Sequence, residues 1–598
     1  MHPGSSLKLL FAAALYLASV PLPAAAQSMA ARGELIAGRY SGTAFVSTTL
    51  VNETVGALPF YNSQYFGAST VIGNIEAGHI WSGHEVFDRT GFGLGPAVTR
   101  EVTGSGALGE TDFHATMVGH VLAGAGYIDG ESGPAFSYSG IGMAPYAELW
   151  SGAIATEFSS ESIGSFDVTT ESMLAPYRAF FRGIDGRKAD VINSSWGGTY
   201  EPGTSVEMVT IDALARENAS VAFVVAAGNS GTSTVSAPGS NDNAITVGAL
   251  GGPEFLTPSE FSSRGWTGFY NPETGWTTPE ARVGVDLAAP GETLFLAAYL
   301  GPTGGLQSLA EIVQSPSPTD LYFLNQDGTS FAAPTVAGGI ALLKDAANDP
   351  QFGISQEGFD TRVIKSALMA GSRRTEGWDN GQADADGVLR TTQALDQATG
   401  AGALDLMGTA EVYLLAATRD VSETGGGSIA ADGWDYGVVS LGQSNDYLFA
   451  SAFTGDIELT IALNWFSGAM IDEQTDLGAG LSFANLDLAL WLVTDGVFVA
   501  KIAESATIFN NTEFLRVNLP EDGTYGLRIT FLGLVYDVTD SVTEETYGLA
   551  WRSQPQAVPE PSGLLLLAVP AGWLIIRRLT RRTSGSISTE MQNSAIPS

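Results

Sequence analysis

Residues 222–229 read Ala-Phe-Val-Val-Ala-Ala-Gly-Asn, a nearly unbroken apolar run that ends in a glycine and an amide side chain. Because the side chains of a strand alternate between its two faces, a continuous apolar run predicts a strand that is buried on both sides. The glycine and asparagine at its end favour the start of a loop. The stretch therefore predicts an inner strand of a parallel sheet.

Three further runs of the same kind occur along the chain, at residues 71–75, 191–193 and 244–249, and loop-forming residues follow them. Helical patterns alternate with these strands over residues 65–345. This alternation predicts an α/β domain with a doubly wound, mostly parallel sheet. In such sheets, functional sites lie just beyond the carboxyl ends of the strands.

The composition excludes several classes of function. The formal net charge of −37 repels phosphates, so we expect no nucleic acid partner. The charge favours solubility outside the cell, and attraction for basic substrates is the alternative interpretation. The absence of cysteine rules out a disulfide framework, a thiol nucleophile and a cysteine-based metal site. Apart from His2, which lies in an N-terminal targeting segment, imidazole chemistry is left to His79, His84, His114 and His120.

A second stretch, residues 327–338, reads Asp-Gly-Thr-Ser-Phe-Ala-Ala-Pro-Thr-Val-Ala-Gly. The glycine at its start permits a tight turn, and the small residues that follow predict a buried helix. Pro334 is expected in the first turn of that helix, where its missing N–H does no harm. Ser330 then lies at the helix N-terminus, which favours developing negative charge.

Two more segments carry side chains that suit the chemistry of a serine nucleophile. Residues 114–121, His-Ala-Thr-Met-Val-Gly-His-Val, predict a helix packed into the core, with His114 at its start. Asn229 follows the strand quoted first, and its amide can donate to an oxyanion.

These segments resemble the subtilase family, and they occur in the family's order over roughly residues 65–410. The resemblance is carried by a nucleophile motif at 328–334, a histidine motif at 114–119, a substrate-binding strand at 190–198, an oxyanion segment at 227–229 and a domain end at 401–405. Phe331 and Ala332 replace the more usual Met and Ser, and Ala115 and Met117 are further departures. The resemblance implies a subtilisin-like peptidase domain over residues 27–415, serine endopeptidase activity, and protein or peptide substrates.

The acid of the expected triad is the main departure from the family pattern. Glu76 follows the strand at 71–75, where the family has Asp. A glutamate is one methylene longer, yet it can accept from the imidazole N–H and stabilise the imidazolium. We therefore predict Glu76, His114 and Ser330 as the catalytic residues, with Asp88 as the fallback acid.

The resemblance also assigns substrate-binding residues. Asn229 and the backbone N–H of Ser330 would stabilise the oxyanion. An extended substrate would pair with two wall segments. One consists of Ser195, Trp196 and Gly197, and the other of Ala226, Ala227 and Gly228. The bulk of Trp196 would narrow a neighbouring subsite.

No metal or cofactor is required by this chemistry, although calcium binding stays open at the acidic stretch 379–386. A solvated loop is the preferred interpretation of that stretch. His79 is not expected to ligate a metal, because further His or Cys ligands are missing. His120 is expected to have a structural role, as a helix cap or as a packed side chain, and His84 is expected at the surface or in a loop.

The C-terminal part changes to an alternating pattern beyond the glycines at 425–427. Alternation at 459–463, 486–491, 514–517 and 525–529, with a turn signal at 522–524, predicts a small all-β sandwich domain over residues 428–552. Around 522–525, this part resembles the pre-peptidase C-terminal type domain that is found beside secreted peptidases.

Both ends of the chain are typical of targeting segments. Residues 1–26 have the charge, apolar stretch and small residues of a secretory signal peptide. Residues 556–582 contain Pro-Glu-Pro at 559–561, an apolar run at 562–576 and four arginines after it, which together resemble the PEP-CTERM sorting signal of Gram-negative bacteria. That resemblance implies exosortase-type sorting machinery as a partner, membrane contact through this segment before processing, and an exported protein of the cell envelope or exterior. A simple C-terminal membrane anchor is the alternative.

Three hypotheses for the whole chain follow. The first is an active endopeptidase that works through Ser330. The second is a catalytically impaired subtilase scaffold that acts as a cell-surface binding protein, and the change to Glu76 is its best support. The third is a structural surface protein in which the β-sandwich dominates.

Overall fold

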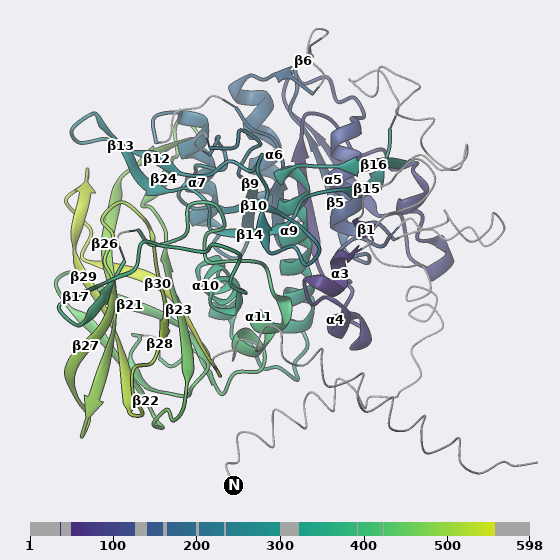
Figure 1. The fold of residues 1–598 in the computed structure, drawn as a ribbon. Helices are drawn as coiled ribbons and strands as arrows, with labels where there is room; N and C mark the ends of the chain where they lie inside the picture. Colours follow the sequence, from purple (N-terminus) through teal and green to yellow (C-terminus); the bar gives the residue numbers. More distant parts are fainter. Residues whose placement is uncertain are drawn as a thin grey trace, which may run out of the picture. The chain divides into compact units, whose positions relative to one another are not determined.

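A parallel sheet lies at the centre of the N-terminal part of the chain (Figure 1). The computed structural model describes residues 36–37, 49–125, 140–159, 164–198, 203–232, 235–299, 322–391, 393–422 and 424–555. The predicted signal peptide at 1–26 and the predicted sorting signal at 556–582 lie outside these residues. Within them, no helix is long and apolar enough to cross a membrane.

The central sheet has eight strands in the order β11-β10-β9-β8-β3-β5-β4, with β14 also paired to β10. All of these neighbours are parallel except β10 and β11. The four predicted strands are confirmed as β3, β8, β9 and β10. The bounds are β3 (Val71–Glu76), β4 (Val98–Thr103), β5 (Glu148–Ala153), β8 (Val191–Ser194), β9 (Ala222–Ala226), β10 (Ile245–Gly251), β11 (Thr257–Pro258) and β14 (Leu287–Pro290).

Helices cover both faces of this sheet, so the predicted α/β architecture is confirmed. The bounds are α3 (Val51–Thr54), α4 (Leu58–Asn62), α5 (Phe113–Ala123), α6 (Thr170–Arg182), α7 (Val206–Glu217), α9 (Thr329–Ala347), α10 (Thr361–Gly371) and α11 (Leu406–Tyr413). Short 3-10 turns are η1 (Glu85–Phe87), η2 (Thr90–Phe92) and η3 (Gln356–Phe359).

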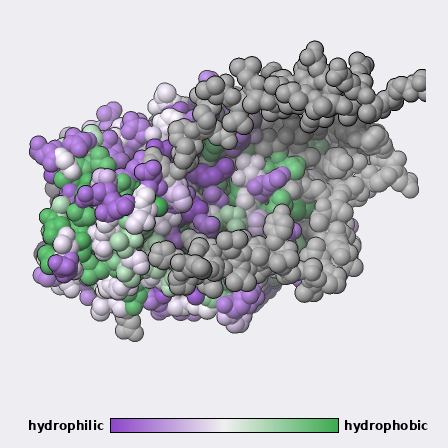
Figure 2. Space-filling model, turned by 60° about the horizontal axis from the view of Figure 1, so that its bottom comes forward, coloured by the Kyte–Doolittle hydropathy of each residue, from purple (hydrophilic) through white to green (hydrophobic). Residues whose placement is uncertain are grey.

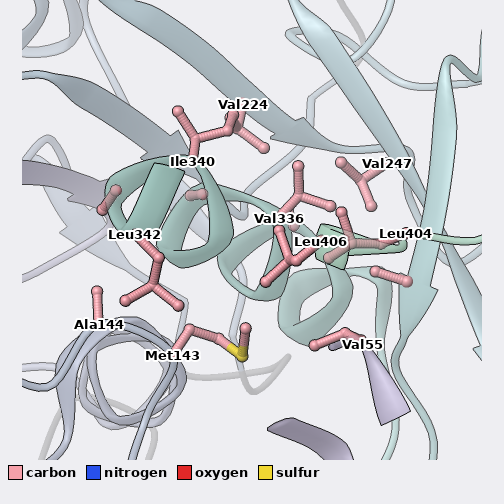
Figure 3. Close-up of a cluster of buried hydrophobic side chains, with 14 of the residues drawn as sticks. Val55, Met143, Ala144, Val224, Val247, Val336, Ile340, Leu342, Leu404 and Leu406 are labelled. Atoms are coloured by element: carbon pink, nitrogen blue, oxygen red, sulfur yellow. The ribbon is translucent and has the colours of Figure 1, made fainter. Parts of the chain in front are cut away.

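The alternation of side chains along β9 explains why both of its faces are apolar. Val224 and Ala226 belong to the cluster that includes α5 and α9, whereas Phe223 and Val225 belong to the cluster that includes α6 and α7. Figure 3 shows the first cluster, with Val336 and Ile340 of α9 next to strand residues such as Val224. Burying each of the Val, Ile and Phe side chains among them stabilises the fold by about 1.5–3 kcal/mol.

Helix α9 is buried along its whole length, from Thr329 to Ala347. Its packing is close at Gly338, where an added Cβ would lie 2.4 Å from Cβ of Met143. Pro334 is the sixth residue of α9 and so lies in its second turn, not in the first turn as predicted. Because Pro334 has no N–H, the carbonyl of Ser330 receives no hydrogen bond from it.

Smaller sheets surround this core. They are β1 (Ile36–Ala37) with β2 (Thr49–Leu50), β15 (Leu294–Ala297) and β16 (Tyr322–Gln326), the pair β6 (Glu157–Phe158) and β7 (Phe166–Asp167), and the hairpin of β12 (Trp266–Asn271) and β13 (Trp276–Val283).

The C-terminal part is rich in strands, as predicted, and contains one seven-stranded and one five-stranded sheet. The seven-stranded sheet runs β17 (Ala383–Ala385), β18 (Val388–Arg390), β27 (Val497–Ser505), β26 (Ser482–Thr494), β29 (Thr524–Asp537), β22 (Ser444–Phe449) and β20 (Gly427–Ile429). The five-stranded sheet runs β19 (Thr418–Arg419), β21 (Gly433–Ser440), β30 (Glu544–Pro555), β23 (Ile457–Trp465) and β28 (Thr512–Asn518). A separate hairpin consists of β24 (Ala469–Asp472) and β25 (Leu477–Gly480).

The surface of this β-rich region carries hydrophobic side chains among polar ones. Figure 2 shows hydrophobic residues gathered at the left of the picture, the side on which Figure 1 draws the β-rich region. Val497, Val499 and Leu532, all from the seven-stranded sheet, are more than half exposed.

Candidate active site

Glu76 and His114 are joined by a hydrogen bond at the carboxyl end of β3. Glu76 is the last residue of that strand and is only 1% exposed. The Nδ1–H of His114 donates to Oε2 of Glu76 at 3.1 Å, and the backbone N–H of Ser195 donates to Oε1 at 2.9 Å. Both carboxylate oxygens are therefore engaged. Since Nδ1 keeps its proton, Nε2 of a neutral His114 is left as the acceptor.

His114 is the second residue of α5, and its side chain is 27% exposed. Burial disfavours the imidazolium, but the hydrogen bond and charge of Glu76, together with the charge of Asp112, outweigh this effect and raise the pKa of His114 above its ordinary value. The predicted fallback acid, Asp88, instead accepts from the backbone and hydroxyl of Thr90 in an exposed loop. Glu76, and not Asp88, is thus the acid paired with His114.

Ser330 is the second residue of α9, and its hydroxyl donates to the carbonyl of Ser195 at 3.1 Å. Among the hydrogen bonds of the described residues, none joins Ser330 directly to His114. The ring of the next residue, Phe331, lies 6.1 Å from the His114 ring, measured between centroids. Ser195 therefore links the two sides of the site, because its N–H binds Glu76 and its carbonyl binds Ser330.

Asn229 follows β9 and is held by the residue that precedes Ser330. Its Oδ1 accepts from the backbone N–H and the hydroxyl of Thr329, each at 2.9 Å, and the N–H of Gly228 donates to the same hydroxyl at 3.0 Å. A backbone N–H can only donate, so the amide oxygen must face Thr329. The Nδ2 donors of Asn229 consequently face away from Thr329.

A cavity of about 340 Å³ adjoins Ser330. Its lining has no charged side chain and consists of Ser195, Trp196, Gly197, Gly198, Ala226, Gly228, Asn229, Ser230, Ser236, Thr329 and Ser330. Of the predicted substrate-binding residues, Ala227 alone is not part of this lining, because it packs with Val235 and Val285. Trp196 is largely buried and lies 6.3 Å from Phe166 between ring centroids.

Sequence reasoning missed Thr329 and Ser236 in this site. Thr329 is adjacent to Ser330 in the Gly-Thr-Ser stretch, so its motif position could have drawn attention to it. Ser236 has no motif signal, yet its Oγ is the nearest atom that an added Cβ at Gly197 or Gly228 would meet, at 2.6 and 2.8 Å. It therefore lies between the two walls of the cavity.

The other histidines make structural contacts. The ring of His79 lies within hydrogen-bonding distance of the Ser151 and Thr103 hydroxyls, and burial lowers its pKa. His120 accepts from the N–H of Ala297 and donates to the carbonyl of Gly140, as expected for a packed residue. His84, expected at the surface or in a loop, does lie in the loop before η1, but it is not at the surface: it is 3% exposed and accepts from the N–H of Val86.

The acidic stretch 379–386 does not form a metal cluster in the structure. Across the described part of the chain, no group of three or more His, Cys, Asp or Glu side chains is placed to hold a metal ion. Asp379 and Asp384 accept instead from the backbone N–H groups of Gly381 and Gly387. The stretch expected to be a solvated loop contains β17, which pairs with β18 just after it.

Comparison with known proteins assigns the chain to a family. Residues 100–402 match the subtilase family, a span that includes His114, Asn229 and Ser330 and starts after Glu76. A solved structure titled "Structure of Prenylagaramide maturation protease PagA" is similar at 20% identity, with a TM-score of 0.39, over 60% of this chain and 97% of that chain. The matched span contains the predicted nucleophile, histidine and oxyanion segments, and the chain belongs to the subtilase family of serine-type peptidases.

Proposed function

We propose that the chain is an endopeptidase that hydrolyses peptide bonds through an acyl-enzyme on Ser330, with His114 as general base and Glu76 as its acid partner. One observation carries this proposal: hydrogen bonds run from His114 through Glu76 and Ser195 to Ser330, residues that are far apart in the sequence. For the proton transfer, the Ser330 hydroxyl would have to leave the Ser195 carbonyl and turn to the imidazole. Catalytic hydrogen bonds are often long in unliganded enzymes.

The reaction follows from the tautomer that Glu76 fixes. Nε2 of His114 takes the Ser330 proton as Oγ attacks the scissile carbonyl, and the carbonyl π electrons move to its oxygen. The Nδ2 group of Asn229 and the backbone N–H of Ser330, at the N-terminus of α9, donate to this oxyanion. The imidazolium then protonates the leaving amine as the C–N bond breaks. Water, deprotonated by His114, then attacks the ester carbonyl of the acyl-enzyme. The carboxylic acid product leaves, and Ser330 regains its proton from the imidazolium.

The cavity beside Ser330 indicates the substrate. We expect its walls, at Ser195–Gly197 and Ala226–Gly228, to pair with an extended peptide backbone. The uncharged lining favours an uncharged side chain before the scissile bond. The chemistry needs no cofactor, and calcium binding at 379–386 stays the alternative to the solvated loop that we predict there.

We further propose that the protein is exported and acts outside the cytoplasm of a Gram-negative bacterium, after sorting by exosortase-type machinery. The signal-like segment at 1–26, the Pro-Glu-Pro segment at 556–582 and the strongly acidic composition support this proposal. For the C-terminal part we propose a β-sandwich, because one hydrophobic cluster draws side chains from both larger sheets, such as Ile461 and Leu463 from β23 and Leu488 and Leu490 from β26.

A fluorophosphonate probe tests the proposed reaction, because it bonds covalently only to an activated serine. We expect the full chain to be labelled once, and Ser330→Ala and His114→Ala to lose the label while keeping the circular dichroism of the wild type. Ser230→Ala, which alters another serine of the cavity lining, is the control and should keep the label. A folded wild-type protein that stays unlabelled would support the impaired binding scaffold instead.

A further inference from the structure

Asp112 is a buried carboxylate that the reaction described above does not use. It directly precedes α5, two residues before His114, and is 2% exposed. Its Oδ2 accepts from the backbone N–H of Ala115 at 2.9 Å, so it caps the helix that carries His114. A cap at this point fixes the backbone from which the imidazole projects.

The segment around Asp112 is also bonded to the segment that follows Glu76. The N–H of Asp112 donates to the carbonyl of His79 at 2.8 Å, and the N–H of His79 donates to the carbonyl of Glu110 at 2.8 Å. The two segments approach so closely at Gly78 that an added Cβ would lie 2.8 Å from Cβ of Asp112 and 2.4 Å from the Glu110 carbonyl oxygen. Asp112 thus joins the turn after Glu76 to the start of α5.

The charge of Asp112 acts on His114 as well. Burial raises the pKa of Asp112 to about 6, while the charge of His114 and backbone N–H groups lower it and the charge of Glu76 raises it. The charge of His114 and the backbone N–H groups thus favour the ionised form of Asp112 against its burial. In the described part of the chain, the charged groups that raise the pKa of His114 are Glu76 at the end of β3 and Asp112, which precedes α5.

We propose that Asp112 is a positioning residue for the proposed peptidase reaction: it fixes the start of α5 and, with Glu76, supplies the negative charge that stabilises the His114 imidazolium. This role rests on the proposed function of His114 as general base. Two carboxylates then share the task of the single triad acid. Glu76 holds the imidazole by a hydrogen bond, and Asp112 holds the backbone and adds charge.

The test compares Asp112→Asn with the wild-type full chain. Asparagine keeps an oxygen for the Ala115 N–H but removes the charge, so the fold and melting temperature should change little. Because only neutral His114 accepts the Ser330 proton, the acidic limb of the pH profile of fluorophosphonate labelling reports its pKa. Without the Asp112 charge, we expect that limb to move to lower pH by about half to one unit and the plateau rate to fall roughly 3- to 10-fold.

A second readout does not depend on activity. With five histidines in the chain, the pKa of His114 can be followed by NMR of imidazole nitrogens, assigned by its absence in His114→Gln. We expect this pKa to fall in Asp112→Asn and equally in Asp112→Ser, a second uncharged cap. Asp405→Asn is the matched control, because Asp405 caps α11 by accepting from Met407 and Gly408 N–H. Neither readout should move in that variant.

The outcomes separate the two proposals. A folded Asp112→Asn or Asp112→Ser with an unchanged His114 pKa overturns the role of Asp112, whatever happens to the rate. Absent labelling of the wild type overturns the peptidase proposal. The NMR titration then still decides whether the charge of Asp112 raises the pKa of His114.

Discussion

Glu76 is the single residue at which the chain departs most from the pattern that it resembles. Its carboxylate bridges two elements, with His114 of α5 on one oxygen and the backbone of Ser195 on the other. The extra methylene of glutamate extends the carboxylate beyond the end of β3, where it meets both partners. We therefore expect the length of this side chain, as well as its charge, to matter.

Two substitutions separate length from charge at this position. Glu76→Asp keeps the charge but is too short to hold both partners, and we expect kcat/KM to fall about 10- to 100-fold through misplacement of the imidazole. Glu76→Gln keeps the length but can donate to Nδ1, which favours the wrong tautomer, and we expect a loss of about 10³- to 10⁴-fold. The measurement is hydrolysis of an unstructured protein substrate.

Glu148→Gln provides the control, since Glu148 lies on the neighbouring strand β5 and pairs with Arg187 at the surface. Its kcat/KM should stay within twofold of the wild type. Equal activities of Glu76→Asp and the wild type would show that the carboxylate position is not constrained.

The site residues found from sequence are those whose neighbours in the chain define their setting, such as Ser330 after a glycine turn. Asp112 and Ser236 were missed because their roles come from contacts across the fold. Asp112 acts through bonds to His79 and Ala115, and Ser236 through its place between Gly197 and Gly228. No local pattern predicts such contacts.

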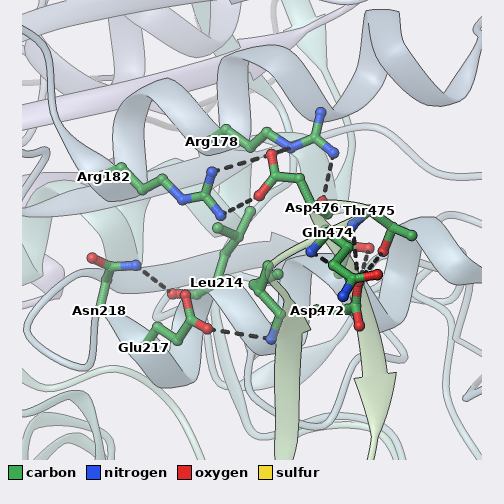
Figure 4. A network of polar contacts seen from close by, with 12 residues as sticks. Arg178, Arg182, Leu214, Glu217, Asn218, Asp472, Gln474, Thr475 and Asp476 are labelled. Atoms are coloured by element: carbon green, nitrogen blue, oxygen red, sulfur yellow. Dashed lines mark hydrogen bonds and ion pairs between the residues drawn. The ribbon is translucent and has the colours of Figure 1, made fainter.

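At the scale of elements, the hairpin of β24 and β25 ties the β-rich region to two helices of the peptidase domain. Asp476 lies in the turn between the two strands, and its carboxylate pairs with Arg178 and Arg182 of α6 (Figure 4). The N–H of Gly478 donates to the Thr210 hydroxyl of α7 at 2.7 Å. The surface ion pairs contribute little on their own, so the close backbone contact should account for most of the stabilisation.

Gly478 tests this contact. An added Cβ would lie 2.5 Å from the carbonyl oxygen of Val209 and 2.6 Å from Cα of Thr210, both backbone atoms. We expect Gly478→Ala to lower the free energy of unfolding by about 1–3 kcal/mol, because the hairpin must move off α7. Gly533→Ala on β29 is the control, since an added Cβ there meets nothing within 4 Å. Similar urea midpoints for Gly478→Ala and the control would contradict a close contact at this position.

The elements that the sequence predicted correctly are those with a strong apolar signal, such as β9, and those with clear alternation, such as β26. The hairpin of β24 and β25 has neither, because its strands pack on a helix rather than in a large sheet. The stretch 379–386 was interpreted as a solvated loop, yet it contains β17, and the next strand, β18, joins β17 to β27 from a distant part of the chain. Pairing of this kind depends on the partner and is invisible in a local pattern.

At the scale of the whole described chain, the peptidase domain and the β-rich region share a hydrophobic core. Trp434, Ala462 and Phe514 belong to the same cluster as the central helix α9. Polar groups also cross this boundary, as when the amide of Asn464 donates to the Ser366 hydroxyl at 2.8 Å. The β-rich region therefore completes the core of the peptidase domain.

Buried titratable groups make the stability of this joint core depend on pH in two directions. Burial lowers the pKa of His120 to about 4, whereas the pKa in the unfolded chain is 6.5. The contribution of neutral His120 to the free energy of unfolding is therefore present above pH 6.5 and is lost as the pH falls through 4. Burial raises the pKa of Glu513 to about 8, against hydrogen bonds from Ser505 and Thr507 that lower it. The contribution of protonated Glu513 to the free energy of unfolding is present below 4.5, its pKa in the unfolded chain, and is lost as the pH rises through 8. Stability should thus be greatest in the weakly acidic range.

Glu513→Gln isolates the alkaline branch. The wild-type carboxyl is buried on β28 and must ionise in place as the pH rises, whereas glutamine stays neutral and keeps an oxygen for the Thr507 N–H and hydroxyl. We expect the variant to be more stable than the wild type by on the order of 1–3 kcal/mol at pH 9 and nearly equal to it at pH 5, by urea unfolding. Glu544→Gln, at an exposed position of β30, should show no such pH dependence. A gain for Glu513→Gln that is as large at pH 5 as at pH 9 would mean that ionisation of Glu513 does not limit stability, and the alkaline loss would then belong to repulsion among the many surface carboxylates.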